Sequence, residues 1–297
     1  MEIKEFGQLL SEEIMSALGD GCRASYNEVE KNNGTIRHAI TIKREGINLA
    51  PNIYIDGHFQ EYKDGRSLAG IVGTILSVYR MNEGAVDFDV ESFTDFARAS
   101  EKLCFKLVNY EKNKNILRDV PYKRFCDLAL VPLCNIDSSA IGRGNIVIRS
   151  DHLKTWEISK EELWENVFEH TQGVMPVSKE GLLNFVRKNA SFVTTDEGEE
   201  FGNMIYILSN SDKCLGAGVI LYPGVLEEIA KEYDKDVFII PSSIHEVIAL
   251  PATDDGDFGF LQKMIREVNR STVSEEEILS DNLYIYHADT GKINICA

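Results

Sequence analysis

The chain has 297 residues, of which 43% are apolar and 27% charged, a composition typical of a folded protein with one large core or two smaller ones. Its 48 acidic side chains outnumber 31 basic ones, and the formal net charge of -17 disfavours binding to nucleic acid and to acidic lipid surfaces. No stretch reaches the roughly 20 apolar residues that cross a bilayer, and the start of the chain lacks a signal-peptide core, so we expect a cytoplasmic protein.

The first half of the chain predicts helices around a small antiparallel sheet. Apolar residues recur at three- and four-residue spacing from Phe6 to Leu18, which predicts a helix. Extended segments separated by turn-forming residues predict a meander from about 23 to 55. The other predicted elements of this half are helices over 65–81 and about 91–103, a surface connection with partial helix over 106–125, strands at 127–134 and 144–148, and a helix over 158–171.

The helix predicted over 158–171 carries a local start signal. Ser159 can accept a backbone amide while Glu162, three residues on, can reach back, which is the pattern of a capping box. Its expected buried face comprises Leu163, Trp164, Val167 and Phe168.

The second half predicts a similar order of elements. A hairpin is expected from strands at 204–210 and 216–222, and a further strand pair at 237–241 and 245–251. The remaining predictions are helices over 179–188, 223–234 and 258–269, a strand at 191–195, and a C-terminal hairpin that turns at 288–291 and pairs with the second sheet.

Both halves can be written as helix, three strands, helix, two strands, helix. We therefore expect an α+β fold of two similar halves, 1–172 and 173–297, each a small antiparallel sheet flanked by helices, joined near Gly173 to Val177. The alternative is an uneven α+β chain in which common motifs recur.

Several segments together resemble a known family. They include KLVNYEKNKNIL, VPYKRFCDLALVP, GAGVILYPGVLEEIA and FIIPSSIHEVIALP, in this order along the chain. They are similar to uncharacterised proteins of gut-dwelling Gram-positive bacteria, known as domain of unknown function five-six-eight-eight. The resemblance implies no catalytic residue. The element order in each half is also similar to that of secretion-chaperone-like folds, which implies polypeptide binding.

The run Ser242-Ser243-Ile244-His245-Glu246 concentrates reactive side chains between two apolar segments. A zinc-protease helix would need a second histidine four residues after His245, where Ala249 stands. A serine hydrolase would use Ser243 or Ser242 with His245, and Glu246 or a distant acid, but the glycines of a nucleophile elbow are missing. We predict a turn between two buried strands, in which the serine hydroxyls bond neighbouring amides.

Other polar features have plainer interpretations. The acidic loops 195–200 and 253–257 lack the last ligand of a calcium loop and are expected to be solvated. The segment Asn109 to Asn115 is expected to be a hydrophilic helix end, with contact to an anionic partner as the alternative. Gly216 to Gly218 are expected to allow close strand packing. Isolated histidines and cysteines predict neither a metal nor a cofactor; these are His38, His58, His152, His170, His287 and Cys22, Cys104, Cys126, Cys134, Cys214, Cys296.

Three functional hypotheses follow. The first is a non-enzymatic binding or accessory protein that contacts another protein, with chaperone-like polypeptide binding as its sharpest form. The second is the serine-type hydrolase built on Ser242, Ser243, His245 and Glu246. The third is an acidic mimic of nucleic acid, which requires carboxylates gathered on one face.

Overall fold

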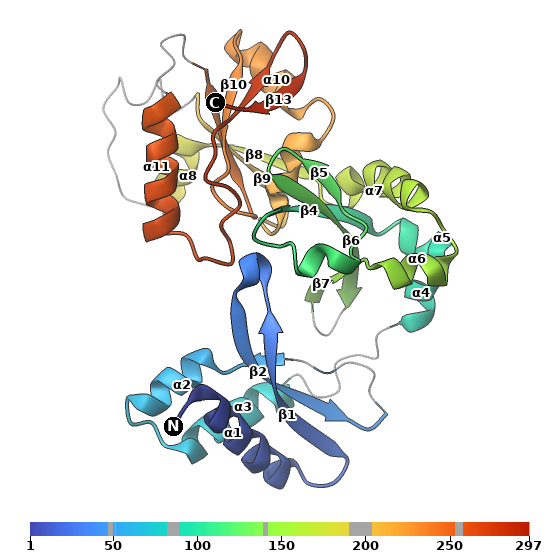
Figure 1. Ribbon diagram of the computed structural model, residues 1–297, viewed down its shortest axis with the longest axis vertical. Helices are drawn as coiled ribbons and strands as arrows, with labels where there is room; N and C mark the ends of the chain where they lie inside the picture. The colour runs from blue at the N-terminus through green and yellow to red at the C-terminus, as the bar shows by residue number, and fades with distance from the viewer. Residues whose placement is uncertain are drawn as a thin grey trace. The chain divides into compact units, whose positions relative to one another are not determined.

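The computed structural model describes residues 1–46, 50, 52–81, 89–138, 142–189, 204–252 and 258–296. The chain divides into two compact units, the first made of Met1–Phe93 with Ile136–Asn145 and the second of Thr94–Asn135 with Ile146–Ala297. Three antiparallel sheets with helices around them form an α+β protein, as predicted (Figure 1). The boundary expected between residues 172 and 173 lies inside a helix of the second unit.

The first unit contains the predicted helix and meander. The helix α1 buries Phe6, Leu10 and Ile14, which recur at four-residue spacing, and it packs beside the three-stranded sheet β1-β2-β3 (Figure 1). The bounds are α1 (Ile3–Leu18), β1 (Cys22–Glu30), the short 3-10 turn η1 (Asn32–Gly34), β2 (Ile36–Arg44) and β3 (Asn52–Tyr54).

Two further helices complete this unit's core. The helix α3 (Leu68–Met81) confirms the prediction over 65–81, because its apolar stripe is buried. The helix α2 (Asp56–Lys63) was not predicted, since it has a low mean hydropathy and contributes only Phe59 and Tyr62 to the core, where both rings lie against Phe6. The short helices α4 (Val90–Thr94) and α5 (Phe96–Ser100) stand where one helix over 91–103 was expected.

A four-stranded sheet, most of whose residues belong to the second unit, begins with a strand that was not predicted. Residues Leu103–Asn109 form β4, not the end of a helix and a surface connection. Strands buried on both faces do not alternate in hydropathy, and β4 is such a strand, with Phe105 packed against Trp164 and Phe168 of the helix above it. The sheet order is β4-β6-β5 with β7 beside β6; the bounds are β5 (Lys123–Phe125), β6 (Leu128–Ser138), β7 (Gly142–Val147) and the 3-10 turn η2 (Ile116–Asp119).

The helix above this sheet starts at the predicted Ser159, with the serine half of the expected capping box. The Ser159 hydroxyl accepts the backbone amide of Glu162 at 3.0 Å and caps α7 (Lys160–Val174). Leu163, Trp164 and Val167 are buried, but Phe168, assigned to the same face, is 45% exposed. The prediction for Phe168 is therefore wrong. The preceding helix is α6 (Ser150–Trp156).

The six-stranded sheet of the second unit has the order β13-β12-β10-β11-β9-β8. The C-terminal hairpin joins it beside β10, as predicted. The helix α11 lies along one face and covers Phe238 and Ile240 with Ile265 (Figure 1). The bounds are β8 (Val177–Gly181), β9 (Tyr206–Asn210), α10 (Val225–Tyr233), β10 (Val237–Ile240), β11 (Val247–Pro251), α11 (Phe258–Ser271), β12 (Tyr284–His287) and β13 (Lys292–Ile295).

Two predictions in this region are wrong. The helix expected over 179–188 begins only at Leu182, as α8 (Leu182–Asn189), because the residues before it pair with β9. The hairpin partner expected at 216–222 is instead the 3-10 helix η3 (Gly216–Leu221), which is buried through Ile220. A buried 3-10 turn and a buried strand are both continuous apolar runs, so their sequences look alike. The strand predicted at 191–195 lies outside the described residues.

The expected similarity of the two halves is not confirmed. In the described part of the chain, the strands of the second half build one six-stranded sheet, whereas those of the first half are divided between a three-stranded and a four-stranded sheet. No helix in the described ranges is both long and apolar enough to span a bilayer.

Candidate functional site

The run Ser242 to Glu246 connects β10 to β11, two strands that pair antiparallel. The Ser243 amide donates to the Glu246 carbonyl at 3.1 Å, and the Ser243 hydroxyl accepts the backbone N–H of His245 at 3.0 Å. The Ser242 amide donates to the Ile240 carbonyl at 3.0 Å. The connection is therefore a turn, as predicted, and the Ser243 hydroxyl bonds its own main chain.

The imidazole of His245 is oriented by two groups outside the turn. Its Nδ1 accepts the backbone N–H of Leu215 at 3.1 Å, so the neutral ring carries its proton on Nε2. Nε2 lies 3.6 Å from the Glu277 carboxylate, and both side chains are partly exposed. This arrangement directs the ring towards Leu215 and Glu277, and among the described residues the Ser243 hydroxyl forms no hydrogen bond with the ring.

The glycines of the GAG run explain how Leu215 reaches this position. The amide of Gly216 donates to the His245 carbonyl at 3.0 Å, and the Ser209 hydroxyl donates to the same oxygen at 2.7 Å. A Cβ at Gly216 would collide with the Asn210 backbone nitrogen, and one at Gly218 would lie 2.9 Å from the Phe105 ring. The glycines allow close packing, as predicted, although of a 3-10 helix and not of a strand.

The remaining candidates from the sequence do not come together. The Nδ1 of His38 lies 2.6 Å from the Tyr26 hydroxyl. The Nδ1 of His287 lies 2.8 Å from the Asp236 carboxylate. His58 pairs with Glu61. In the ranges that the structure describes, no three histidine, cysteine or acidic side chains are arranged to hold a metal ion. The acidic loops 195–200 and 253–257 fall outside those ranges.

Basic side chains lie over aromatic rings on one surface of the second unit, which the sequence did not predict. Its most closely packed pair is Arg124, whose guanidinium carbon is 3.5 Å from the centre of the Tyr110 ring. Lys160 lies 5.5 Å from the centre of the Tyr122 ring, and the two tyrosine rings are 5.7 Å apart. We call this the aromatic–basic surface, and define it by Tyr110, Tyr122, Lys123, Arg124, Lys160 and Phe168.

The helix α7 and the edge strand β5 extend this surface. Lys160, Trp164 and Phe168 recur at four-residue spacing on α7, which places them along one line of the helix. Lys123 of β5 lies 5.4 Å from the ring centre of the buried Trp164 and 5.0 Å from that of the exposed Phe168. Cations over aromatic faces are attracted by the ring quadrupole, so the side chains of both elements form one patch.

The two tyrosines are coupled to the cations. A hydrogen bond from Tyr122, together with Arg124, holds the pKa of the Tyr110 hydroxyl below its ordinary value, and the same bond raises the pKa of Tyr122. This hydrogen bond joins the segment after β4 to the residue before β5.

A signal for this surface was present in the sequence. The sequence of Asn109 to Asn115 allows contact with an anionic partner, and the basic residues Lys123 and Arg124 follow in the same surface connection. Trp164 and Phe168 are both expected on the buried face of the helix, and only the fold shows that Lys123 lies over their two rings.

The protein has an α+β fold with three antiparallel sheets. Its candidate site is the aromatic–basic surface, and no metal-binding cluster is present among the described residues. The chain belongs to a family of unknown function (DUF5688), whose profile matches residues 3–288. No curated protein and no solved structure matches it.

Proposed function

We propose that this protein is a cytoplasmic, non-enzymatic binding or accessory protein that holds an acidic segment of another polypeptide on the aromatic–basic surface. The observation that supports the proposal is the patch itself: Lys123, Arg124 and Lys160 each lie over an aromatic ring in a chain whose net charge is -17.

The charges of this patch are available to a partner. In the part of the chain that the structure describes, Lys123, Arg124 and Lys160 have no carboxylate partner, although acidic side chains outnumber basic ones. Lys123 and Arg124 are exposed. A carboxylate that approaches them loses little hydration at the rim and gains charge-assisted hydrogen bonds, most strongly with the forked donors of arginine.

The aromatic rings determine the kind of partner. Phe168 is 45% exposed, and Tyr110 and Tyr122 are half-buried, so a partner can cover apolar ring surface while its acids meet the cations. Aromatic and arginine side chains are enriched where protein interfaces gain most of their affinity. An acidic peptide with interspersed apolar residues matches both features.

The alternatives have less support. The hydrolase hypothesis requires the imidazole of His245 to activate a serine, but the Nδ1 of His245 accepts the Leu215 amide and the Ser243 hydroxyl accepts a backbone N–H. The acidic-mimic hypothesis, which requires carboxylates gathered on one face, stays a prediction.

The test uses the full chain and fluorescein-labelled peptides in which glutamates alternate with pairs of aromatic and aliphatic residues. We expect saturable binding by fluorescence anisotropy, weakened on the order of a hundredfold by the double charge reversal Lys123→Glu with Arg124→Glu. The matched control reverses Lys263 and Arg266, which are both exposed on α11 outside the patch. Equal binding by the two double variants would contradict the proposal, as would a peptide with lysines in place of glutamates that binds equally well.

A further inference from the structure

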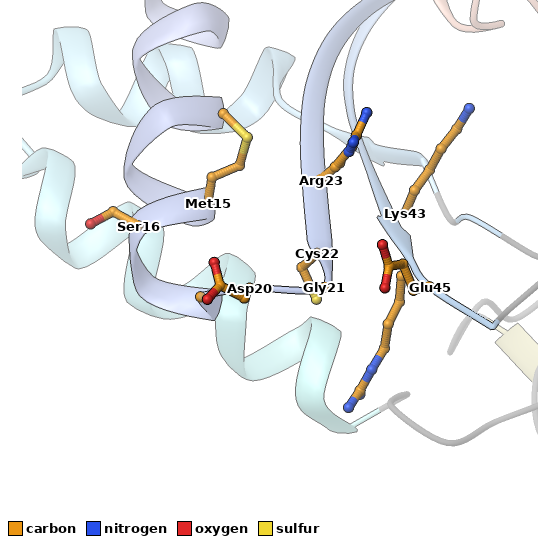
Figure 2. Close-up of a pocket in the computed structure, with 10 residues that line it drawn as sticks. Met15, Ser16, Asp20, Gly21, Cys22, Arg23, Lys43 and Glu45 are labelled. Atoms are coloured by element: carbon orange, nitrogen blue, oxygen red, sulfur yellow. The ribbon is translucent and has the colours of Figure 1, made fainter.

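A hollow of about 630 Å³ lies in the first unit, where the last turn of α1 meets the open end of the β1–β2 hairpin (Figure 2). Its position is independent of the aromatic–basic surface, which belongs to the second unit. The lining residues that matter to its chemistry are Met15, Asp20, Cys22, Arg23, Lys43 and Glu45.

Local backbone conformation brings the helix and the hairpin together at this point. Helix α1 ends at Leu18, and Gly19 and Gly21 follow with φ of 72° and 88°, in the left-handed region that glycine adopts without strain. The chain therefore reverses within three residues and enters β1 at Cys22. The amide of Glu45 donates to the Gly21 carbonyl at 2.9 Å, which ties the end of β2 to this turn.

The two strands place like charges opposite each other. Arg23 of β1 is the register partner of Lys43 of β2, and directly opposed side chains of an antiparallel pair stand on the same face about 5 Å apart. Figure 2 shows both side chains extending in the same direction. Like charges in this relationship are destabilising, and both residues are exposed.

Neither cation has an acidic partner within the described residues. The hollow also contains the carboxylates of Asp20 and Glu45, but neither forms an ion pair or side-chain hydrogen bond with Arg23 or Lys43. The Arg23 and Lys43 pair is therefore a place where a bound anion would remove a repulsion instead of displacing an existing ion pair.

We propose that this hollow binds a phosphorylated small molecule with a hydroxyl-bearing body. The forked guanidinium of Arg23 can donate two hydrogen bonds to phosphate oxygens while the Lys43 ammonium supplies a second positive charge. The volume lies within the range of small-molecule sites and far exceeds that of a phosphate ion, so an organic body fits beside it. Asp20 and Glu45 supply acceptors for its hydroxyl groups.

The experiment is calorimetric titration of the full chain with glucose 6-phosphate, glucose and inorganic phosphate as probes. We expect saturable binding of glucose 6-phosphate, at least about tenfold tighter than binding of either glucose or phosphate alone. Arg23→Gln and Lys43→Gln should each weaken it about tenfold, because each removes one charged donor. Lys4→Gln, which removes an exposed charge of α1 outside the hollow, is the matched control and should bind as the unaltered chain does.

Thermal unfolding of the same variants separates loss of the site from loss of the fold. Because Arg23 and Lys43 repel each other, either variant should unfold at the same temperature as the unaltered chain or at a higher one in the absence of ligand. Glucose 6-phosphate should raise the unfolding temperature of the unaltered chain and of Lys4→Gln more than that of the two site variants. The proposal is overturned if no probe binds saturably, if phosphate alone binds as tightly as glucose 6-phosphate, or if the site variants bind as Lys4→Gln does.

Discussion

The backbone N–H of Gly216 donates to the carbonyl oxygen of His245 at 3.0 Å, and this approach leaves no room for a side chain at position 216. A Cβ there would lie 2.8 Å from that oxygen and still closer to the backbone nitrogen of Asn210. Main-chain atoms of a paired strand cannot move aside as the end of a flexible side chain can. The helix η3 can therefore pack against the β10–β11 connection only because residue 216 is a glycine, which has no Cβ.

We expect Gly216→Ala to lower the free energy of unfolding by about 3 kcal/mol, the upper range for an overpacked interior. Denaturant unfolding followed by circular dichroism measures this change. The control is Gly173→Ala on α7, where a Cβ meets nothing within 4 Å, and alanine there should raise the free energy of unfolding by roughly 0.5 kcal/mol. If both variants were equally stable, the close approach at Gly216 would be wrong.

Substitutions can show which ring nitrogen of His245, Nδ1 or Nε2, contributes to stability. His245→Ala removes the acceptor of the Leu215 amide and should cost about 1 to 2 kcal/mol of stability. Asparagine carries its Oδ1 near the position of the ring Nδ1, so His245→Asn should recover most of the loss. The glutamine side chain reaches towards Glu277 instead. Because the partly exposed contact between residue 245 and Glu277 contributes little stability, His245→Gln should be about as unstable as His245→Ala.

The reverse order, with glutamine stable and asparagine unstable, would show that the Nε2 side of the ring is the important one. A hydrolase would also behave differently. If His245 served as a base, all three replacements would abolish an activity without a graded change in stability. The free energies of unfolding of the three variants therefore distinguish the structural role of the ring from a catalytic role.

The buried thiol of Cys104 predicts a loss of stability at alkaline pH. Burial, with a smaller contribution from Cys134, raises the pKa of Cys104 from 9.0 to about 12. Between these values the unfolded chain ionises and the folded chain does not, so rising pH favours unfolding. We expect the free energy of unfolding to fall between pH 9 and pH 10, by at most about 1.4 kcal/mol per pH unit for this thiol.

Denaturant unfolding at pH 8, 9 and 10 under reducing conditions measures this slope. Cys104→Ala should be less stable at pH 8, because it leaves a small cavity, but should lose less stability as the pH rises. Iodoacetamide at pH 8 should modify Cys104 and Cys134 only after unfolding, whereas the exposed Cys214 should react in the folded chain. An unchanged slope in Cys104→Ala would contradict the assignment.

Several helices and strands were predictable because the spacing of their apolar residues matches the single face that each buries. The stripe from Phe6 to Leu18 has a single apolar face and forms α1. The segment Val237–Ile240, the turn and Val247–Pro251 also form the expected strand pair, since β-branched residues flank serines that can bond neighbouring amides. The sequence pattern failed at β4 and at η3, because consecutive residues of both segments are buried and their hydropathy therefore has no period to detect.

The sequence by itself determined the α+β class, most of the individual elements and the turn at Ser242 to Glu246, because these depend on contacts between residues near one another in the chain. Only the tertiary structure decided how the strands divide into three sheets, that Lys123 lies over Trp164 and Phe168, and that Arg23 stands opposite Lys43. The physical reason is that strand register and long-range packing bring distant residues together, and a cation acquires its neighbours, and with them its chemistry, only when that packing is complete.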